Sequence, residues 1–408
     1  MHNMRRYIYI ICVWTGIGLL LTGCDLLQPG EVQNPNVIED DFASSSQAMQ
    51  TWVNGTNAEF GACISAFAEV TGLLSDDLYN NSSRSAKTAD VLDFQYTSDE
   101  VADLSTYIGK MIEMADFGLE TVAKRDATTT AQQRFNLCYV KAIAYLMASE
   151  NFVALPASAD GDVLTSEGLA KAAVSTLDQA SAYAASADDE ALVALLKARA
   201  YRLCGQTDDA AAQADSVLRK SPTLLVQAMF DDINGYANSL QQYVATGLFT
   251  VLPRLQMQKV KCPQAGLYEQ PIAVAKAEEA YLILAEASAL NADYVQVRKH
   301  LADLVQAVAD RNDSTVSVLS LSADDLSSVT DRKTALETIY RSRQEIFFAE
   351  GRRSADMGIR MPMSEVEYVS RGNLPSAYIE MHIPDWLLPI KDSIDSFVDL
   401  NSRLVESM

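Results

Sequence analysis

Charged side chains gather between Tyr340 and Pro362, in the stretch YRSRQEIFFAEGRRSADMGIRMP. The charged cluster consists of Arg343, Glu345, Glu350, Arg352, Arg353 and Asp356. One chemistry open to it is the binding of an anionic ligand, and the other is ion pairing within the fold. The planar guanidinium group of arginine matches carboxylates and the carbonyl end of a helix. We therefore favour a buried or half-buried ion-pair network that holds the last long helix, so that Arg353→Ala should lower stability rather than ligand affinity.

Tyrosines beside carboxylates and amides, in stretches without helical periodicity, offer a second chemistry. A tyrosine ring stacks on the apolar face of a sugar while carboxylates and amides bind its hydroxyl groups. The candidate ligand-binding residues are Asp76, Asp77, Tyr79, Asn80, Asn81, Tyr96, Tyr236, Tyr243 and Tyr268. Packing explains any one of them more simply, but we expect one or two to line a site, with Tyr79 the leading candidate.

Catalytic chemistry has little support in this sequence. Beyond the N-terminal segment the chain has only two histidines, His300 and His382, which excludes a histidine-rich metal site. No GxSxG, HExxH or P-loop motif occurs. The run Asp160-Gly161-Asp162 is too short for an EF-hand loop, and paired acids are common in any acidic chain. We predict a protein that is not an enzyme and needs no metal or cofactor.

The N-terminus has the pattern of an exported, lipid-modified protein. Arg5 and Arg6 precede the uncharged apolar run Tyr7–Leu21, and small residues then precede Cys24. The segment resembles a bacterial lipobox, in which Cys24 receives the lipid. A plain transmembrane anchor is the alternative, although the apolar run is short for a full span. We predict a signal peptide over residues 1–23 and a lipidated tether over residues 24–41.

Composition limits the remaining classes of function. The 408 residues are 49% hydrophobic and carry a net charge of −22, which suits a large globular core and opposes binding to nucleic acid or anionic lipid. Cys63, Cys138, Cys204 and Cys262 are far apart and form no CxxC motif. We expect free thiols rather than disulfides, because a core of this size needs no covalent links.

Helical repeats are the elements that must position these side chains. The run Ala275–Leu290 lacks Gly and Pro and has apolar residues at helical spacing. Between Ala191 and Pro222, a small residue, a large residue, the turn residue Gly205 and a second small residue follow the logic of a tetratricopeptide repeat. Repeat-like helices are expected near residues 135–155, 168–222 and 275–308. The predicted fold is mostly α, with long irregular loops and little or no β.

The other segments complete a single domain over residues 42–408. We expect Leu73–Asp99 to be a polar surface excursion and residues 226–274 to be an insertion, with a short strand near Leu248–Val251. A C-terminal helix followed by an irregular tail should occupy residues 334–408.

Three parts of the chain resemble the SusD/RagB family of outer-membrane nutrient-binding lipoproteins. Arg343, Glu345, Glu350, Gly351, Arg353 and Asp356 match the family's Arg-x-x-Glu helix and the Glu-Gly-x-Arg segment after it. The helix Glu278–Leu290 is similar to the family's AEAYLLLAEA helix, and Ile383–Ile390 (IPDWLLPI) to its Ile-Pro segment.

The resemblance implies a SusD-like helical domain on the outside of a Bacteroidota-type outer membrane. It implies binding of an oligosaccharide or similar nutrient and its delivery to a TonB-dependent SusC-like transporter, with the membrane contacted only through the lipid. The chain is short for the family, and its insertion is small, so ligand residues do not carry over. The alternative is a repeat-scaffold lipoprotein that assembles other proteins and binds no small ligand.

Overall fold

The computed structural model describes residues 47–80, 95–251, 259–260, 266–393 and 399–408. The chain divides into two compact units, Met1–Ser45 and Ser46–Met408, and the described residues all belong to the second unit. The predicted signal peptide and the whole predicted tether, with the predicted lipid site Cys24, fall in the first unit. They lie outside the described residues, as do Asn81 and Cys262.

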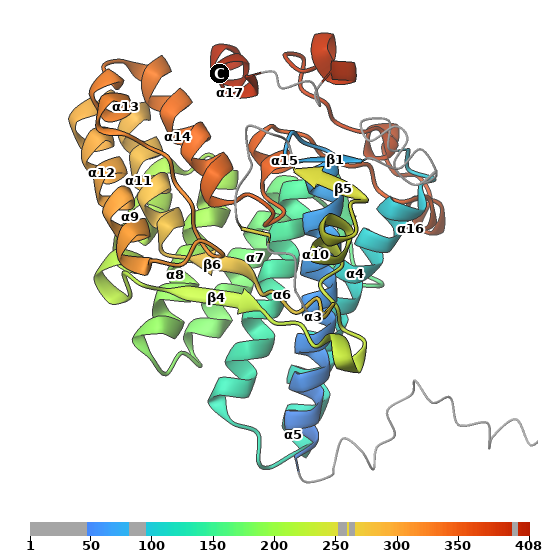
Figure 1. Ribbon diagram of the computed structural model, residues 1–408. Coiled ribbons are helices and arrows are strands. Elements are labelled where there is room, and N and C mark those ends of the chain that lie inside the picture. The colour runs from blue at the N-terminus through green and yellow to red at the C-terminus, as the bar shows by residue number, and fades with distance from the viewer. Residues whose placement is uncertain (1–46, 81–94, 252–258, 261–265, 394–398) are drawn as a thin grey trace, which may run out of the picture. The chain divides into compact units, whose positions relative to one another are not determined.

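Helices make up most of the second unit (Figure 1). Thr130, Ser186 and Asp331 each form a capping box with the residue three positions on. These side chains bind backbone N–H groups that have no partner in the first turn, so they fix where each helix begins. The longer helices are α3 (Ala48–Leu73), α4 (Asp99–Phe117), α6 (Ala131–Asn151), α7 (Ser166–Ser181), α8 (Ala187–Leu203), α9 (Thr207–Lys220), α11 (Glu278–Leu290), α12 (Tyr294–Arg311), α14 (Arg332–Ile346) and α17 (Leu400–Ser407). The shorter ones are α5 (Ala123–Arg125), α10 (Ser239–Ala245), α13 (Ala323–Ser328), α15 (Arg353–Asp356) and α16 (Glu365–Arg371).

Consecutive helices pack against each other as hairpins. Helix α6 contacts α7, α8 contacts α9 and α11 contacts α12, and the contacts of α7 with α8 and of α9 with α11 join one hairpin to the next (Figure 1). Ala142, Ala198, Ala210 and Ala285 are all buried, which lets the helices approach closely. Gly205 turns the chain between α8 and α9 with a φ of 70°, a conformation that glycine adopts without strain. The predicted mostly α, tetratricopeptide-like fold class is confirmed.

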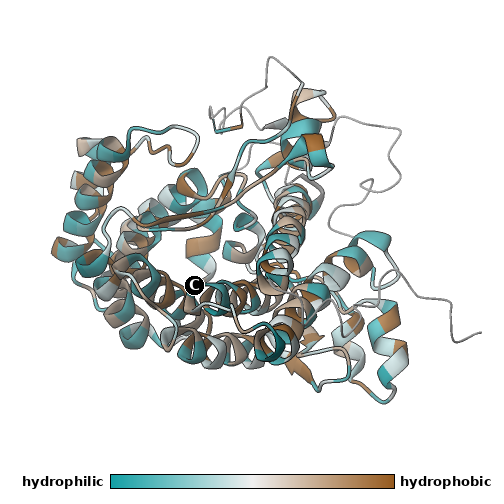
Figure 2. Ribbon diagram, turned by 90° about the horizontal axis from the view of Figure 1, so that it is seen from below, coloured by the Kyte–Doolittle hydropathy of each residue, from teal (hydrophilic) through white to brown (hydrophobic). Residues whose placement is uncertain are grey.

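Helix α11 separates two hydrophobic cores. Ala280 and Ile283 face the larger core, which runs through α3, α4 and α6–α9. Leu282 and Ala285 face a smaller core formed with α12, α14 and α17. Because both sides of α11 are buried, its sequence is apolar almost all round. Figure 2 shows the hydrophobic and hydrophilic residues alternating around the other helices, as expected for elements that bury only one face.

Within the residues that the structure describes, the strands form three antiparallel two-stranded ribbons. The pairs are β1 (Leu78–Asn80) with β5 (Phe249–Val251), β2 (Ala154–Pro156) with β3 (Val163–Thr165), and β4 (Leu225–Ala228) with β6 (Ile272–Lys276). The prediction of little β structure is therefore correct, and β5 coincides with the short strand expected near Leu248–Val251.

Three boundaries differ from the sequence expectation. The helix expected from Ala275 begins at Glu278, because the preceding residues form the buried strand β6. The insertion over residues 226–274 is not only loop, since it contains α10 and most of the β4–β6 pairing. The C-terminal tail contains α16 and α17 and is therefore not irregular throughout.

Within the described residues, no helix combines the length and the hydropathy that a membrane crossing needs. The same part of the chain holds no group of three or more His, Cys, Asp or Glu side chains placed to bind a metal. Cys63, Cys138 and Cys204 are free thiols, and the first two are buried.

Candidate functional site

The charged cluster is an ion-pair network inside the protein. Arg343 and Asp356 form two contacts of 2.8 Å, from Nε to Oδ2 and from Nη2 to Oδ1, and both side chains are almost fully buried. Arg352 reaches Glu279 on α11 at 2.6 Å. Burial raises the pKa of Glu279, but Arg352 and Arg199 outweigh that effect and lower it to about 2. The network therefore joins the segment after α14 to the repeat helices by carboxylates that stay charged.

One member of the predicted cluster lies apart from the network. The carboxylate of Glu345 accepts hydrogen bonds from the backbone N–H and the hydroxyl of Ser320, at 2.6 and 2.5 Å. These contacts hold the loop before α13 rather than the core, so Glu345 is not part of the buried cluster.

Two buried lysines share the carboxylate of Glu350. Oε1 of Glu350 is 2.6 Å from Nζ of Lys259 and 2.6 Å from Nζ of Lys276. Both ammonium groups also donate to the carbonyl of Ile346, the last residue of α14, each at 2.7 Å. The negative end of the helix dipole thus helps to hold a second positive charge beside one carboxylate. Burial, opposed by Glu350, lowers the pKa of Lys276 to about 7.

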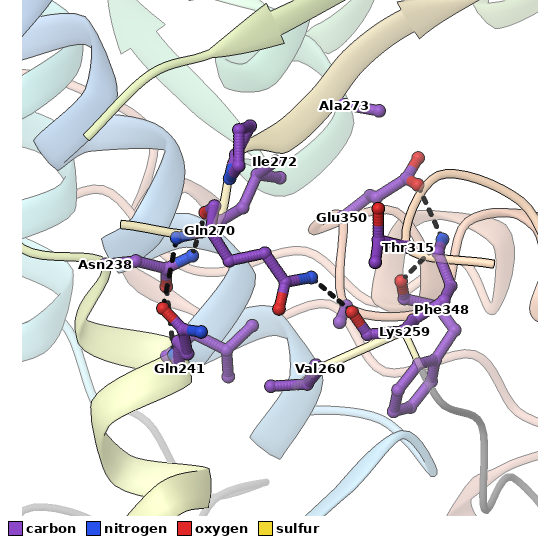
Figure 3. A pocket seen from close by; sticks show the side chains of 13 residues that line it. Asn238, Gln241, Lys259, Val260, Gln270, Ile272, Ala273, Thr315, Phe348 and Glu350 are labelled. Atoms are coloured by element: carbon purple, nitrogen blue, oxygen red, sulfur yellow. Dashed lines mark hydrogen bonds and ion pairs between the residues drawn. The ribbon is translucent and has the colours of Figure 1, made fainter. Parts of the chain in front are cut away.

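The space beside Lys259 is a small polar junction (Figure 3). Its volume is about 20 Å³, room for about one water molecule. Gln270 donates to the carbonyl of Lys259, and Asn238 donates to the carbonyl of Gln270 at 2.7 Å. This junction ties the insertion to the end of α14 and is too small to hold a sugar.

Asp76 and Asp77 were predicted to bind ligand from a surface loop, and the structure buries both of them. Asp76 is 0% exposed and binds Nε of Arg353 at 2.7 Å, so it belongs to the ion-pair network. Asp77 is 3% exposed, and its Oδ1 has no hydrogen-bond partner within the described part of the chain. Burial and the neighbouring charge of Asp76 raise the pKa of Asp77 to about 8. Neither carboxylate is available to a ligand in solution.

Tyr79, Asn80 and Tyr243 belong to one small assembly around the β1–β5 ribbon. Tyr79 is 43% exposed and lies opposite Thr250, while Asn80 pairs with Phe249. The ring of Tyr243, on α10, packs edge-on against Phe249 at 5.1 Å between ring centroids. Tyr243 is thus a packing residue, and Tyr79 remains the exposed ring of this group.

The other predicted tyrosines lie in two further places. Tyr236 forms a bridge with Asp231, and the carbonyl of Tyr268 accepts the N–H of Asn238, so both belong to the loops that flank α10. Tyr96 packs edge-on against Tyr368 at 6.5 Å, and its carbonyl accepts the N–H of Glu365 at 2.7 Å, at the first residue of α16. The structure therefore does not bring the predicted residues together into one site.

A groove that the sequence did not indicate lies between α4, the β2–β3 turn and α16. Its volume is about 470 Å³, within the range of roughly 300–1,000 Å³ typical of small-molecule sites. The lining residues are Ser105, Thr106, Ile108, Gly109, Lys110 and Glu113 from α4, Leu155, Pro156, Ser158 and Ala159 from the turn, and Glu367, Ser370 and Arg371 from α16.

The groove combines an apolar base with polar walls. Ile108 and Leu155 are each 1% exposed and supply the base. Arg371 is held by Glu367 at 2.8 Å and by the carbonyl of Ala159 at 2.5 Å, and Lys110 is held by Glu59 at 2.7 Å. Hydroxyl, carboxylate and cationic groups with fixed positions above an apolar surface can bind the hydroxyls and the C–H face of a sugar ring.

The conformation of α4 keeps this groove open. A Cβ atom added to Gly109 would meet nothing within 4 Å, so the glycine faces free space. One turn of π-helix, Gly118–Val122, follows α4, and there a Cβ on Gly118 would meet Leu137 at 2.5 Å and Trp52 at 2.7 Å. The two glycines of one continuous helical segment thus do different things: Gly118 permits close packing and Gly109 leaves space.

The stacked hairpins and the loops at their ends define a tetratricopeptide-like helical scaffold. Within that class the protein has the SusD-like fold, as comparison with crystal structures shows. A SusD-like carbohydrate binding protein from Bacteroides vulgatus aligns with a TM-score of 0.55 and 15% identity, over 76% of this chain and 82% of that one. A SusD superfamily protein from Bacteroides thetaiotaomicron aligns with a TM-score of 0.57 and 12% identity, over 86% of this chain and 94% of that one. A SusD homolog from Bacteroides thetaiotaomicron aligns with a TM-score of 0.54 and 11% identity, over 80% of this chain and 88% of that one.

Sequence comparison adds nothing to this likeness. No family profile matches the chain, and no curated protein matches it. At 11–15% identity these structural relatives establish the fold alone.

Proposed function

We propose that the protein is a lipid-anchored, non-catalytic receptor that binds an oligosaccharide at the outer surface of the cell and passes it to a TonB-dependent SusC-like transporter. The observation that carries this proposal is the fold, shared with a SusD-like carbohydrate binding protein over 76% of the chain. The lipobox-like sequence ending at Cys24 supports the anchor.

The groove between α4 and α16 is our candidate for the sugar-binding site. Among the candidate places it alone joins a suitable volume to an apolar base and several polar side chains. The exposed ring of Tyr79 lies elsewhere, on β1, and could stack a sugar there instead.

Filling the groove tests this assignment. Gly109→Phe would place a ring at the lining of the groove, and nothing lies within 4 Å of the added Cβ. Calorimetry with a panel of oligosaccharides, on the full-length protein in detergent, should find a ligand whose affinity drops at least tenfold in this variant. The control is Ala212→Phe, which places the same ring at an exposed position of α9, outside the groove.

Two results would count against the assignment. Undiminished affinity in Gly109→Phe would reject the groove, and Tyr79→Ala would then test the ribbon. A wild-type protein that binds no glycan would favour the alternative, a scaffold that assembles other proteins.

One surface has the character of a protein contact and supports the transporter as partner. Met229, Ile233, Tyr236 and Leu267 are 62%, 77%, 38% and 40% exposed, and they lie on the loops that flank α10. Exposed apolar side chains in one area are typical of sites that contact another protein. Co-purification of the transporter with the wild-type protein, and its loss in Met229→Asp with Ile233→Asp, would test the contact.

A further inference from the structure

Arg360 is a half-buried cation without a counter-ion in the described part of the chain. Its Nε is buried and has no hydrogen-bond partner there. Buried arginines elsewhere in the protein are paired: Arg199 with Glu150, Arg343 with Asp356, and Arg353 with Asp76. An uncompensated guanidinium is costly to bury, so a cation left in this state calls for an explanation.

The carboxylate that acts on the charge of Arg360 is already neutralised by other arginines. Glu150 acts on the charge of Arg360, but it is bound by Arg199 and lies 3.6 Å from Arg352. Arg352 also binds Glu279 at 2.6 Å. Two guanidinium groups and two carboxylates balance in that group, which leaves the charge of Arg360 in excess.

His382 lies directly opposite Arg360. The backbone N–H of each donates to the carbonyl of the other, at 3.0 and 2.9 Å, which forms an isolated antiparallel bridge. Side chains of a directly opposed pair point to the same face. Arg360 is half-buried and His382 is exposed, so the pair can be reached from solvent.

The protonation of His382 supports its role as a hydrogen-bond donor. Burial and the charge of Arg360 lower the pKa of His382, against a smaller opposing effect of Asp385. The ring is then neutral at pH 7 and has one N–H to donate. Together the two side chains bring one positive charge and several N–H donors to the same face of the bridge.

We propose that Arg360 and His382 bind the carboxylate of an acidic sugar, a hexuronic acid unit within the glycan ligand; this rests on the proposed function. A guanidinium group binds a carboxylate through two parallel N–H···O contacts, and the imidazole adds a third. One excess positive charge matches a monoanion. A dianion such as a phosphate ester would be repelled more strongly by a protein of net charge −22.

The experiment uses the ring signals of the histidines in the full-length protein, labelled with ¹³C at the ring carbon and held in detergent. D-glucuronate should shift the His382 signal in a saturable way, and D-glucose should not. In Arg360→Met the response to glucuronate should weaken at least tenfold, because the paired N–H donors and the charge are gone. His300, on α12, serves as the internal reference for intact folding.

The outcomes separate this inference from the proposed function. No shift of His382 with glucuronate, or an equal shift in Arg360→Met, overturns the carboxylate site even if neutral glycans bind in calorimetry. A saturable shift that Arg360→Met abolishes supports the site. If Arg360→Met disturbs the His300 signal, Arg360→Lys replaces it, since it keeps the charge but loses the paired donors and should bind glucuronate more weakly than the wild type.

Discussion

Arg353 binds Asp76 through two of its nitrogens, at 2.7 and 3.1 Å, and both residues are buried. The partners are 277 positions apart, so the pair fastens the C-terminal segment to the end of α3. A third nitrogen of Arg353 donates to Asn401 on α17 at 3.0 Å. Each of the three nitrogens of this guanidinium thus makes a hydrogen bond inside the protein.

We expect Arg353→Ala to lower the free energy of unfolding by about 3–5 kcal/mol, because it leaves the charge of Asp76 buried and uncompensated. Urea unfolding measures this. The control is Arg341→Ala, which removes a pair with Asp325 whose arginine is 45% exposed and should cost less than about 1 kcal/mol. Unchanged unfolding together with lost glycan binding would show that Arg353 serves the ligand.

Asp77 makes stability depend on pH in a known direction. Its pKa is about 8 in the folded protein, against an ordinary value near 3.8. Between these values the folded state keeps a proton that the unfolded state has released, so the contribution is complete below about pH 4, declines as the pH rises, and is lost by about pH 8. Asp77→Asn removes this dependence.

The variant Asp77→Asn should therefore match the wild type in unfolding free energy near pH 4 and exceed it at pH 9 by at least about 1 kcal/mol, since one pKa unit corresponds to about 1.4 kcal/mol. Chemical unfolding at the two pH values measures the difference. If the two proteins differ by the same amount at both pH values, Asp77 is charged in the folded state.

For single residues, the sequence predicts which side chains form ion pairs better than it predicts where those side chains lie in the structure. The arginines and acids of the C-terminal cluster were expected to pair, and most of them do. The burial of Asp76 and Asp77 was missed, because a polar run gives no sign that an arginine far along the chain will cover it. Only a signal that links positions 76 and 353 could have found this.

At the scale of elements, α4 with the π-turn after it contains two glycines with opposite consequences. We expect Gly118→Ala to destabilise the protein by about 1–3 kcal/mol, because the methyl group would press on Leu137 and Trp52. Gly109 lies more than two turns away on the same segment. Gly109→Ala should stabilise the protein by about 0.5–1 kcal/mol, because alanine favours the helix and nothing lies within 4 Å of the added methyl group. Thermal unfolding of both variants measures the contrast, and a gain for both would mean that the α4–α6 contact can relax.

The long helices could be predicted because capping residues and apolar residues at helical spacing mark them. The two-stranded ribbons were harder to predict from the sequence. Strand β6 consists of the apolar run Ile272–Ala275 and Lys276, and it is followed closely by α11. A short apolar run does not distinguish strand from helix. Its identity comes from pairing with β4, about 45 residues earlier. The groove was unpredictable for a similar reason: its walls come from three distant segments, each with ordinary polar residues.

At the scale of the whole molecule, the proposed anchor can be tested without knowledge of the ligand. Cys24→Ala should abolish incorporation of labelled palmitate, because the predicted attachment point of the lipid is the thiol of this residue. Cys12→Ala, within the predicted signal peptide, is the control and should incorporate palmitate normally. Continued labelling of Cys24→Ala would locate the lipid elsewhere.

The fold as a whole was recoverable from the sequence through a few local motifs, even though the structural relatives are only 11–15% identical. The lipobox-like sequence, the alanine-rich helix Glu278–Leu290 and the charged cluster each resemble the SusD-like pattern. The site was not recoverable, because the groove is lined by three segments that lie far apart in the sequence.

The shared carboxylate of Glu350 has a consequence for how the polypeptide matures. Four buried charged residues form ion pairs with residues between 350 and 353, near the end of the chain. The four are Lys259, Lys276, Asp76 and Glu279. During synthesis these groups lack those partners until the ribosome has passed residue 353, so the contacts that bury them form late. A chain that lacks its last seventh therefore lacks the partners of all four groups and should remain sensitive to proteases.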